Sequence, residues 1–327
     1  MKKLKLKGIC PIIETPFTKT GEVDYDSLQN EVFFLAEGGC NAVTLFGIAG
    51  EYYKLSDEES KKMIKVVVDS CNKKGIPSIV SVTQHATELA IKSAKYYQDC
   101  GADSLMLMPP FFLKPSLDDI INHIKQVCCA VSIPVIIQYA PEHTGVSFSP
   151  EMLASLSNSV SNDLYFKIEC KPAGAYITSL LSKIGDSGKV LIGNAAYQFI
   201  ESLDRGAIGA MPGPSMFDIY ITIYNKYVNG NREGAKQLHE SIILPLLNNI
   251  FQNVEMLIAY EKRILCKRGV IETDKCRQPT FVSDPHYDKI FEEYCNMIKE
   301  NVEDVIWFYG KNFKNRLNNE ANRSRNA

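Results

Sequence analysis

The sequence reads NAVTLF at residues 41–46, DEESKKMIKVVVDSCNK at 57–73 and PSIVSVT at 77–83. The first and third stretches are short, apolar and rich in β-branched residues, a pattern typical of buried strands. The middle stretch has the apolar spacing of an amphipathic helix and follows Ser56, a residue type that caps helix N-termini. A strand joined through a helix to a parallel strand is the repeating unit of a parallel sheet.

The same unit recurs along the chain. Eight short apolar runs are present: Gly8–Glu14, Asn41–Phe46, Pro77–Thr83, Ser104–Met108, Pro134–Tyr139, Leu164–Ile168, Lys189–Gly193 and Ala207–Met211. Helical patterns follow them: Asp24–Glu37, Asp57–Lys73, Thr87–Asp99, Leu117–Ala130, Pro150–Leu156, Ala173–Ser182, Tyr197–Leu203 and Pro214–Val228. Eight such units in about 225 residues predict an α/β fold, a TIM (β/α)8 barrel. An open doubly wound sheet is the alternative, but no G-x-G-x-x-G motif follows the first run.

The residues after 228 have a different pattern. Helical stretches follow without a further strand: Gly234–Asn248, Val254–Arg268, His286–Asn301 and Val302–Phe308. We therefore predict a barrel at residues 1–228 and a C-terminal helical extension at 229–310. The segment 311–327 is polar and basic, and we expect it to be a disordered tail.

Composition limits the classes of function. Lys and Arg number 36 against 38 Asp and Glu, a net charge of −2, which argues against nucleic acid as a partner. No apolar run approaches the roughly 18 residues of a membrane span, and no apolar segment follows the basic N-terminus as in a signal peptide. The ten cysteines lack C-x-x-C or zinc-site spacing, so we expect reduced thiols, a cytoplasmic protein and no metal ion or cofactor.

Lys167 lies inside the sixth apolar run. Side chains alternate between the two faces of a strand, so Phe166 and Ile168 should face the helices while Lys167 points into the barrel. Burial favours the neutral amine, which attacks carbonyl carbons and can form a Schiff base. The alternative is an ion pair between Lys167 and Glu169 that has no chemical role.

Further candidates follow the C-terminal ends of strands, where the catalytic groups of such barrels lie. Tyr139 and Glu169 are candidates for proton transfer. The loop Gly47-Ile48-Ala49-Gly50 has flanking glycines, which let backbone N–H groups converge on an anion such as a carboxylate. A plain connecting loop is the alternative.

These motifs together resemble the dihydrodipicolinate synthase / N-acetylneuraminate lyase family of class I aldolases and lyases. The resemblance runs from about Gly8 to Pro279. It rests on Thr15-Pro16-Phe17, Gly47–Glu51, Leu55-Ser56, Ala140-Pro141, Thr144-Gly145, Lys167 and Gly206-Ala207-x-Gly209. It implies a TIM barrel with a C-terminal helical extension that forms a homo-oligomer, a tetramer or a dimer. It also implies that Lys167 forms a Schiff base with a small-molecule 2-keto acid.

The chain departs from the family pattern around the substrate. Ile48 and Ala49 replace two hydroxyl residues that hold the substrate carboxylate, so the backbone N–H groups of Ala49 and Gly50 would hold it instead. Gln138 replaces a tyrosine that relays protons, and because an amide does not titrate near neutrality, Gln138 would orient the iminium. Phe112 replaces a second tyrosine of that relay.

Three loop residues complete the predicted substrate site. They are Phe112 after the fourth strand, His143 at the position of a carboxylate-binding arginine after the fifth, and Asn194 after the seventh. Loss of the relay and of the arginine argues against the synthase activity of the family.

A branch of the family that is similar to L-2-keto-3-deoxyarabonate dehydratase shares the Gln-x-Ala-Pro that begins at Gln138, the segment Tyr165–Glu169 and the late Arg268–Ile271. We therefore predict a Schiff-base-forming lyase, a dehydratase or an aldolase, that acts on a 2-keto-3-deoxy sugar acid. Dihydrodipicolinate synthase and N-acetylneuraminate lyase are alternatives with the same fold. A non-catalytic protein that binds a keto acid is the alternative of another class.

Overall fold

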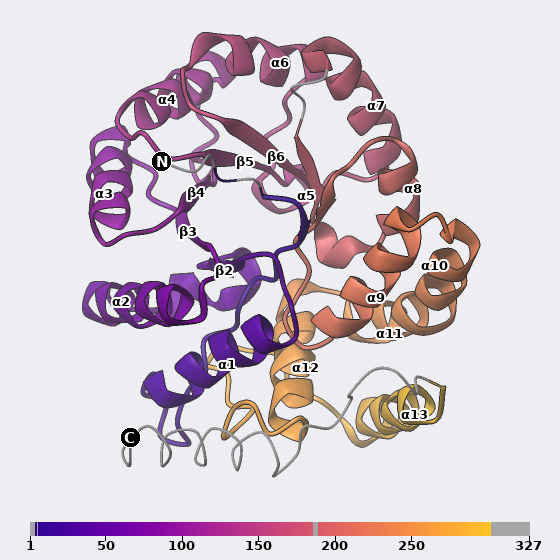
Figure 1. Ribbon diagram of the computed structural model, residues 1–327. Coiled ribbons are helices and arrows are strands. Elements are labelled where there is room, and N and C mark those ends of the chain that lie inside the picture. The colour runs from indigo at the N-terminus through magenta and orange to yellow at the C-terminus, as the bar shows by residue number, and fades with distance from the viewer. Residues whose placement is uncertain (1–3, 5, 186–188, 302–327) are drawn as a thin grey trace, which may run out of the picture.

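A computed structural model describes residues 4, 6–185 and 189–301 of the chain. The predicted tail at 311–327 and the predicted helix Val302–Phe308 lie outside the described residues. Eight parallel strands form the centre of the molecule (Figure 1). They are β1 (Gly8–Ile9), β2 (Val43–Leu45), β3 (Ser78–Val82), β4 (Ser104–Leu107), β5 (Val135–Tyr139), β6 (Leu164–Ile168), β7 (Val190–Ile192) and β8 (Gly209–Ala210).

The strands pair in the order β1-β8-β7-β6-β5-β4-β3-β2. The chain around β1 also pairs with the chain around β2, because the N–H of Asn41 donates to the carbonyl of Ile9 at 2.7 Å and the N–H of Ile13 donates to the carbonyl of Thr44 at 2.9 Å. Hydrogen bonds therefore run around the whole sheet. The predicted TIM-barrel fold is confirmed.

A ring of helices surrounds the strands (Figure 1). They are α1 (Tyr25–Glu37), α2 (Asp57–Lys74), α3 (Thr87–Asp99), α4 (Leu117–Cys129), α6 (Pro150–Ser159), α7 (Ala173–Ile184), α8 (Phe199–Asp204) and α9 (Phe217–Val228). The short α5 (Pro141–Thr144) follows β5 directly and lies inside this ring (Figure 1). Ser56 caps α2 as predicted: its hydroxyl accepts from the N–H of Glu59 at 3.2 Å, and the Glu59 carboxylate accepts from the N–H of Ser56 at 2.9 Å. Short 3-10 turns follow two strands: η1 (Ile48–Gly50) and η2 (Tyr52–Lys54) after β2, and η4 (Asn194–Ala196) after β7.

The side chains on the two faces of β6 pack into two different hydrophobic cores. Phe166 and Ile168 belong to the large core between the strands and the helices, whereas Tyr165 belongs to a smaller core inside the barrel. Lys167 is therefore on the inner side, as the alternation predicted. In the pairing of β5 with β6, Lys167 lies opposite Gln138.

After α9 the chain continues through α10 (Arg232–Leu238), the π-helical turn η5 (His239–Ile243), α11 (Leu244–Ile250), α12 (Val254–Lys267) and α13 (Pro285–Asn301). The single helix predicted at Gly234–Asn248 is wrong in this detail, because the π turn interrupts it just before Pro245, whose ring removes a hydrogen-bond donor. The division of the chain at residue 228 stays a prediction. Among the described residues, none of the helices has the length and apolar character that a membrane span requires.

Helix α12 contacts the turn η1, so the extension reaches the end of the barrel at which β2 finishes. Figure 1 shows α12 close to the barrel and α13 farther from it. Because the strands are parallel, this is the end at which all eight strands finish. The extension therefore contributes side chains to the same region as the loops after the strands.

Candidate active site

A pocket opens at this end of the barrel. Its empty space amounts to about 490 Å³, part of it open to solvent. Its lining comes from the barrel and from the extension: Ile12, Ile48, Ala49, His143, Lys167, Glu169, Asn194, Ala195, Met211, Pro212, Gly213, Phe251, Val254, Leu257 and Glu261.

Lys167 and Glu169 form an ion pair in this pocket. The Nζ atom of Lys167 lies 2.9 Å from Oε1 of Glu169. Nε2 of Gln138 donates to Oε2 of the same carboxylate at 2.7 Å, and the backbone N–H of Asn194 donates to Oε1 at 3.0 Å. The side chains of Lys167, Gln138 and Glu169 are all buried. The structure thus brings three predicted site residues together around the carboxylate of a fourth, Glu169.

Two opposing effects act on the Glu169 carboxyl. Burial on its own raises the pKa of a carboxyl, because the charged form loses its water. The Lys167 ammonium and the hydrogen bond from Gln138 outweigh burial here, and the pKa of Glu169 lies below its usual value. Glu169 is therefore a carboxylate at neutral pH, beside the one lysine of the pocket lining.

The turn after β7 has an unusual backbone. Asn194, Ala195 and Ala196 all lie in the left-handed region, with φ of 53°, 51° and 54°. Residues with a Cβ adopt this region at a cost, and the strain is found mainly at functional sites. The hydroxyl of Tyr220 donates to the carbonyl of Ala195 at 2.6 Å, which holds the turn. The turn directs the N–H of Asn194 at Glu169, and no sequence pattern in the segment signalled this.

One of the two backbone donors predicted in the loop after β2 is engaged within the loop itself. Ile48 and Ala49 line the pocket. The N–H of Gly50, however, donates to the carbonyl of Gly47 at 2.9 Å within the 3-10 turn. The Gly50 N–H is therefore already engaged within the turn, and its contact with a carboxylate stays a prediction. Gly47 serves packing, because a Cβ there would come within 2.3 Å of a methyl group of Ile12.

Two predicted residues do not reach the pocket. The ring of Tyr139 belongs to the outer core and stacks on Tyr176 with ring centroids 4.6 Å apart. The outward direction of Tyr139 was predictable from the sequence, because neighbouring side chains on a strand face opposite sides and Gln138 faces inward. The side chain of Phe112 is 78% exposed and does not belong to the pocket lining. His143 does line the pocket.

Glu261 is a residue of the pocket that was not predicted from the sequence. This residue lies on α12, far from the strand ends along the chain, and is nevertheless part of the pocket lining. Its Oε2 atom accepts from the backbone N–H of Ser215 at 2.9 Å. The helical pattern of residues 254–267 gave no reason to assign Glu261 to a substrate pocket. Which face of a helix lines a pocket depends on how the helix packs in the tertiary structure.

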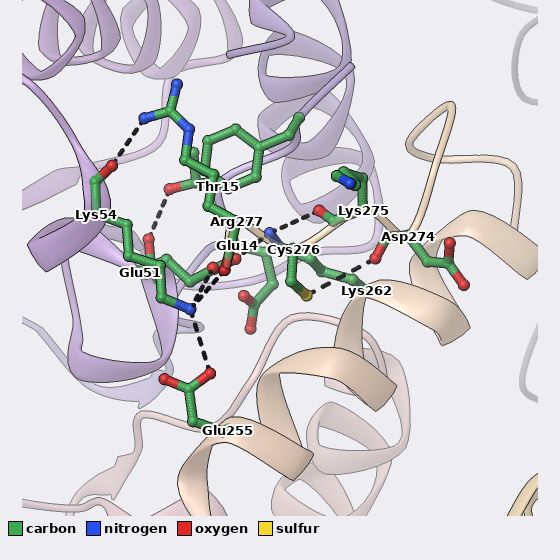
Figure 2. Close-up of polar contacts among 12 residues, drawn as sticks. Glu14, Thr15, Glu51, Lys54, Glu255, Lys262, Asp274, Lys275, Cys276 and Arg277 are labelled. Carbon is green, nitrogen blue, oxygen red and sulfur yellow. Dashed lines mark hydrogen bonds and ion pairs between the residues drawn. The ribbon is translucent and has the colours of Figure 1, made fainter. Parts of the chain in front are cut away.

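A second group of buried charged side chains lies between the loop after β2 and α12 (Figure 2). Lys262 of α12 is fully buried, forms an ion pair with Glu51 and donates to the carbonyl of Lys275 at 3.2 Å. Lys54 binds Oε2 of Glu51 at 3.0 Å and Glu255 at 3.2 Å. These ion pairs tie the extension to the loop that carries Ile48 and Ala49.

Two buried carboxyls lie near Lys262. The backbone N–H of Glu14 donates to Oε1 of Glu31 at 3.0 Å. Both carboxyl oxygens of Glu14 and Oε2 of Glu31 have no hydrogen-bond partner among the described residues. Burial raises the pKa of Glu14 well above its usual value and that of Glu31 to about 8. The folded state therefore favours the neutral form of both carboxyls, and Glu31 is mainly neutral at pH 7. The described residues contain no group of three or more His, Cys, Asp or Glu side chains placed to hold a metal ion.

An eight-stranded barrel with a pocket at the C-terminal ends of its strands has the architecture of a TIM-barrel enzyme. Residues 5–297 match the Dihydrodipicolinate synthetase family. The chain belongs to this family, and it is a lyase of the aldolase and dehydratase type.

Known relatives of the chain are named for two different activities. A 4-hydroxy-tetrahydrodipicolinate synthase of Citrifermentans bemidjiense is 32% identical over 253 residues, which cover 75% of this chain and 83% of the relative. An L-2-keto-3-deoxyarabonate dehydratase of Azospirillum brasilense is 27% identical over 278 residues, 84% of this chain and 88% of the relative. The crystal structure of dihydrodipicolinate synthase from Rhodopseudomonas palustris superposes with a TM-score of 0.82 at 26% identity, covering 90% of this chain and 99% of that one.

Proposed function

We propose that the protein is a dehydratase that forms a Schiff base between Lys167 and the C2 carbonyl of a 2-keto-3-deoxy sugar acid. The observation on which this rests is the buried contact of 2.9 Å between Nζ of Lys167 and Oε1 of Glu169 inside the pocket. A lysine with a carboxylate in contact has a base beside it that can take its proton and expose the nucleophilic amine.

Schiff-base formation conserves protons in this arrangement. The Lys167 ammonium gives a proton to Glu169, and the neutral amine attacks the carbonyl carbon. The attacking nitrogen gives one of its protons to the new oxygen, Glu169 returns a second, and the oxygen leaves the carbinolamine as water. An ammonium and a ketone thus become a protonated iminium and water, and Glu169 is again a carboxylate. The iminium withdraws electrons from C3, so Glu169 can then take a C3 proton and leave an enamine.

The residue at position 138 favours dehydration over the synthase reaction. Nε2 of Gln138 fixes the Glu169 carboxylate at 2.7 Å, and an amide does not relay protons near neutral pH. Gln138 is also part of the Gln-x-Ala-Pro and β6 motifs that resemble the dehydratase branch. The A. brasilense relative of that name supports the same choice.

The substrate carboxylate would lie where the side chains of the pocket offer N–H donors. The described pocket lining contains one lysine, Lys167, and one histidine, His143. Among these described residues it contains no arginine. We propose that His143 and the backbone of Ala49 contact the carboxylate and that the amide of Asn194 contacts a sugar hydroxyl. Oδ1 of Asn194 is buried and has no hydrogen-bond partner among the described residues, which leaves it available to a substrate O–H group.

Reductive trapping tests the first step. The protein is incubated with pyruvate or with L-2-keto-3-deoxyarabonate and borohydride, and the adduct is mapped by mass spectrometry. We expect it on Lys167 and expect Lys167→Met to abolish it. Lys171→Met, which removes a side chain that is 53% exposed, is the matched control and should leave it unchanged. No adduct on Lys167 with any 2-keto acid tried would refute the proposal.

Product analysis separates the candidate activities. Loss of water from L-2-keto-3-deoxyarabonate supports the dehydratase. Condensation of pyruvate with aspartate semialdehyde would instead support the synthase, which several relatives are named for. Thermal stabilisation by keto acids without turnover would support a binding protein. The homo-oligomer and the cytoplasmic location stay predictions, which light scattering and fractionation check.

A further inference from the structure

Glu261 is a second carboxyl in the pocket that holds Lys167 and Glu169. It comes from α12 of the extension, and its side chain is buried. The N–H of Ser215 fixes Oε2 at 2.9 Å. The other oxygen, Oε1, lies against Gly213, the second residue after the Met211 that follows β8. The reaction proposed above gives Glu261 no role.

Two glycines make room for the two carboxyls. A Cβ at Gly193, just after β7, would lie 2.2 Å from Cγ of Glu169. A Cβ at Gly213, just beyond β8, would lie 2.3 Å from Oε1 of Glu261. Real side chains do not approach so closely, so any other residue at either position would displace a carboxyl. Neither glycine has a positive φ, so space and not backbone freedom is the physical requirement at both positions.

The surroundings of the two carboxyls differ in charge. Glu169 contacts the Lys167 ammonium, which favours its ionised form. Burial raises the pKa of Glu261, and the hydrogen bond from the Ser215 N–H and the charge of Arg268 offset this only in part. One pocket therefore holds a carboxylate and a carboxyl that retains its proton to higher pH. Such a pair is the usual arrangement of a general base and a general acid.

We propose that Glu261 is the general acid that protonates the hydroxyl leaving from C4 of the substrate. This inference rests on the proposed dehydratase function. The enamine nitrogen pushes its electron pair toward C2, the C2–C3 double bond shifts to C3–C4, and the C4–O bond breaks. The oxygen leaves with that electron pair, takes the proton of Glu261 and departs as water. Glu169 then holds the proton from C3, and exchange with solvent restores both carboxyls.

Two reactions of the same enzyme separate this role from the rest of the site. Exchange of the C3 protons of pyruvate with deuterium oxide needs Lys167 and Glu169 but no leaving group. Dehydration of L-2-keto-3-deoxyarabonate needs the acid as well. Glu261→Gln keeps the acceptor for the Ser215 N–H but removes the acidic proton. We expect it to keep borohydride trapping at Lys167, to keep exchange within about threefold and to lower the kcat of dehydration by about 100-fold or more.

Gly213→Ala tests the same role from the barrel side. The added methyl group would displace the Glu261 carboxyl without changing its chemistry, so dehydration should fall while exchange persists. Glu293→Gln, on α13 of the same extension and outside the pocket lining, is the matched control, because its side chain is 62% exposed, and it should keep both reactions.

Each outcome separates the two proposals. If wild-type protein gives no adduct at Lys167, the Schiff-base function itself fails. If wild-type protein dehydrates the sugar acid and Glu261→Gln dehydrates it within threefold of that rate, the acid role of Glu261 is overturned. A parallel fall of exchange and dehydration in Glu261→Gln would also overturn it, because Glu261 would then only position other groups.

Discussion

Replacing Glu31 by glutamine should change how the stability of the protein depends on pH. Glu31 is fully buried on α1, and burial raises the pKa of its carboxyl from 4.5 to about 8. The folded state therefore favours the neutral acid, whereas the unfolded chain ionises it above about pH 4.5. The contribution of Glu31 to stability is fully present below pH 4.5 and is lost as the pH rises toward 8.

The size of the effect follows from the shift. A pKa difference of one unit corresponds to 1.36 kcal/mol, so a rise from 4.5 to about 8 corresponds to roughly 5 kcal/mol. Glutamine has nearly the same shape and keeps an oxygen to accept from the N–H of Glu14, but it does not titrate. Its own packing cost is the same at every pH. Relative to wild type, Glu31→Gln should therefore gain about 1.4 kcal/mol of stability per pH unit between about pH 5 and pH 8.

Urea unfolding followed by far-ultraviolet circular dichroism, at several pH values between about 4 and 8, measures this difference. Asp26→Asn is the matched control, because Asp26 is exposed on the same helix and its substitution should leave the pH profile of wild type unchanged. A stability difference between Glu31→Gln and wild type that stays constant from pH 4 to pH 8 would refute the reasoning. It would mean that Glu31 titrates as it does in the unfolded chain.

Other substitutions test other parts of the site. Gly193→Ala should lower kcat by about 100-fold, because its methyl group would displace Glu169, and a steady-state assay with unchanged kcat would contradict this. Lys262→Met should cost about 3 kcal/mol in urea unfolding, because it leaves Glu51 buried with one partner fewer, and adding Glu51→Gln should recover part of the loss. Tyr139→Phe should keep kcat/KM within about twofold of wild type, because the ring stacks outside the pocket; a loss of tenfold or more would show that its hydroxyl takes part.

The position of Lys167 was predictable because a strand has a period of two. Once Phe166 and Ile168 are assigned to the helix-facing core, the residue between them has to face the barrel axis. The same rule, applied to β5, would have separated Gln138 from Tyr139, and naming both as site residues overlooked it. The eight strands were likewise predictable, because short apolar runs alternate with amphipathic helices.

The sequence by itself determined the strands, the helices, the barrel and the inward direction of one lysine, because these depend on short-range periodicity. Only the tertiary structure decided which other groups meet that lysine. The left-handed turn at Asn194 depends on the hydroxyl of Tyr220, and Glu261 reaches the pocket because α12 packs over the strand ends. Contacts between segments so distant along the chain depend on how helices pack on the barrel, and no local pattern encodes them.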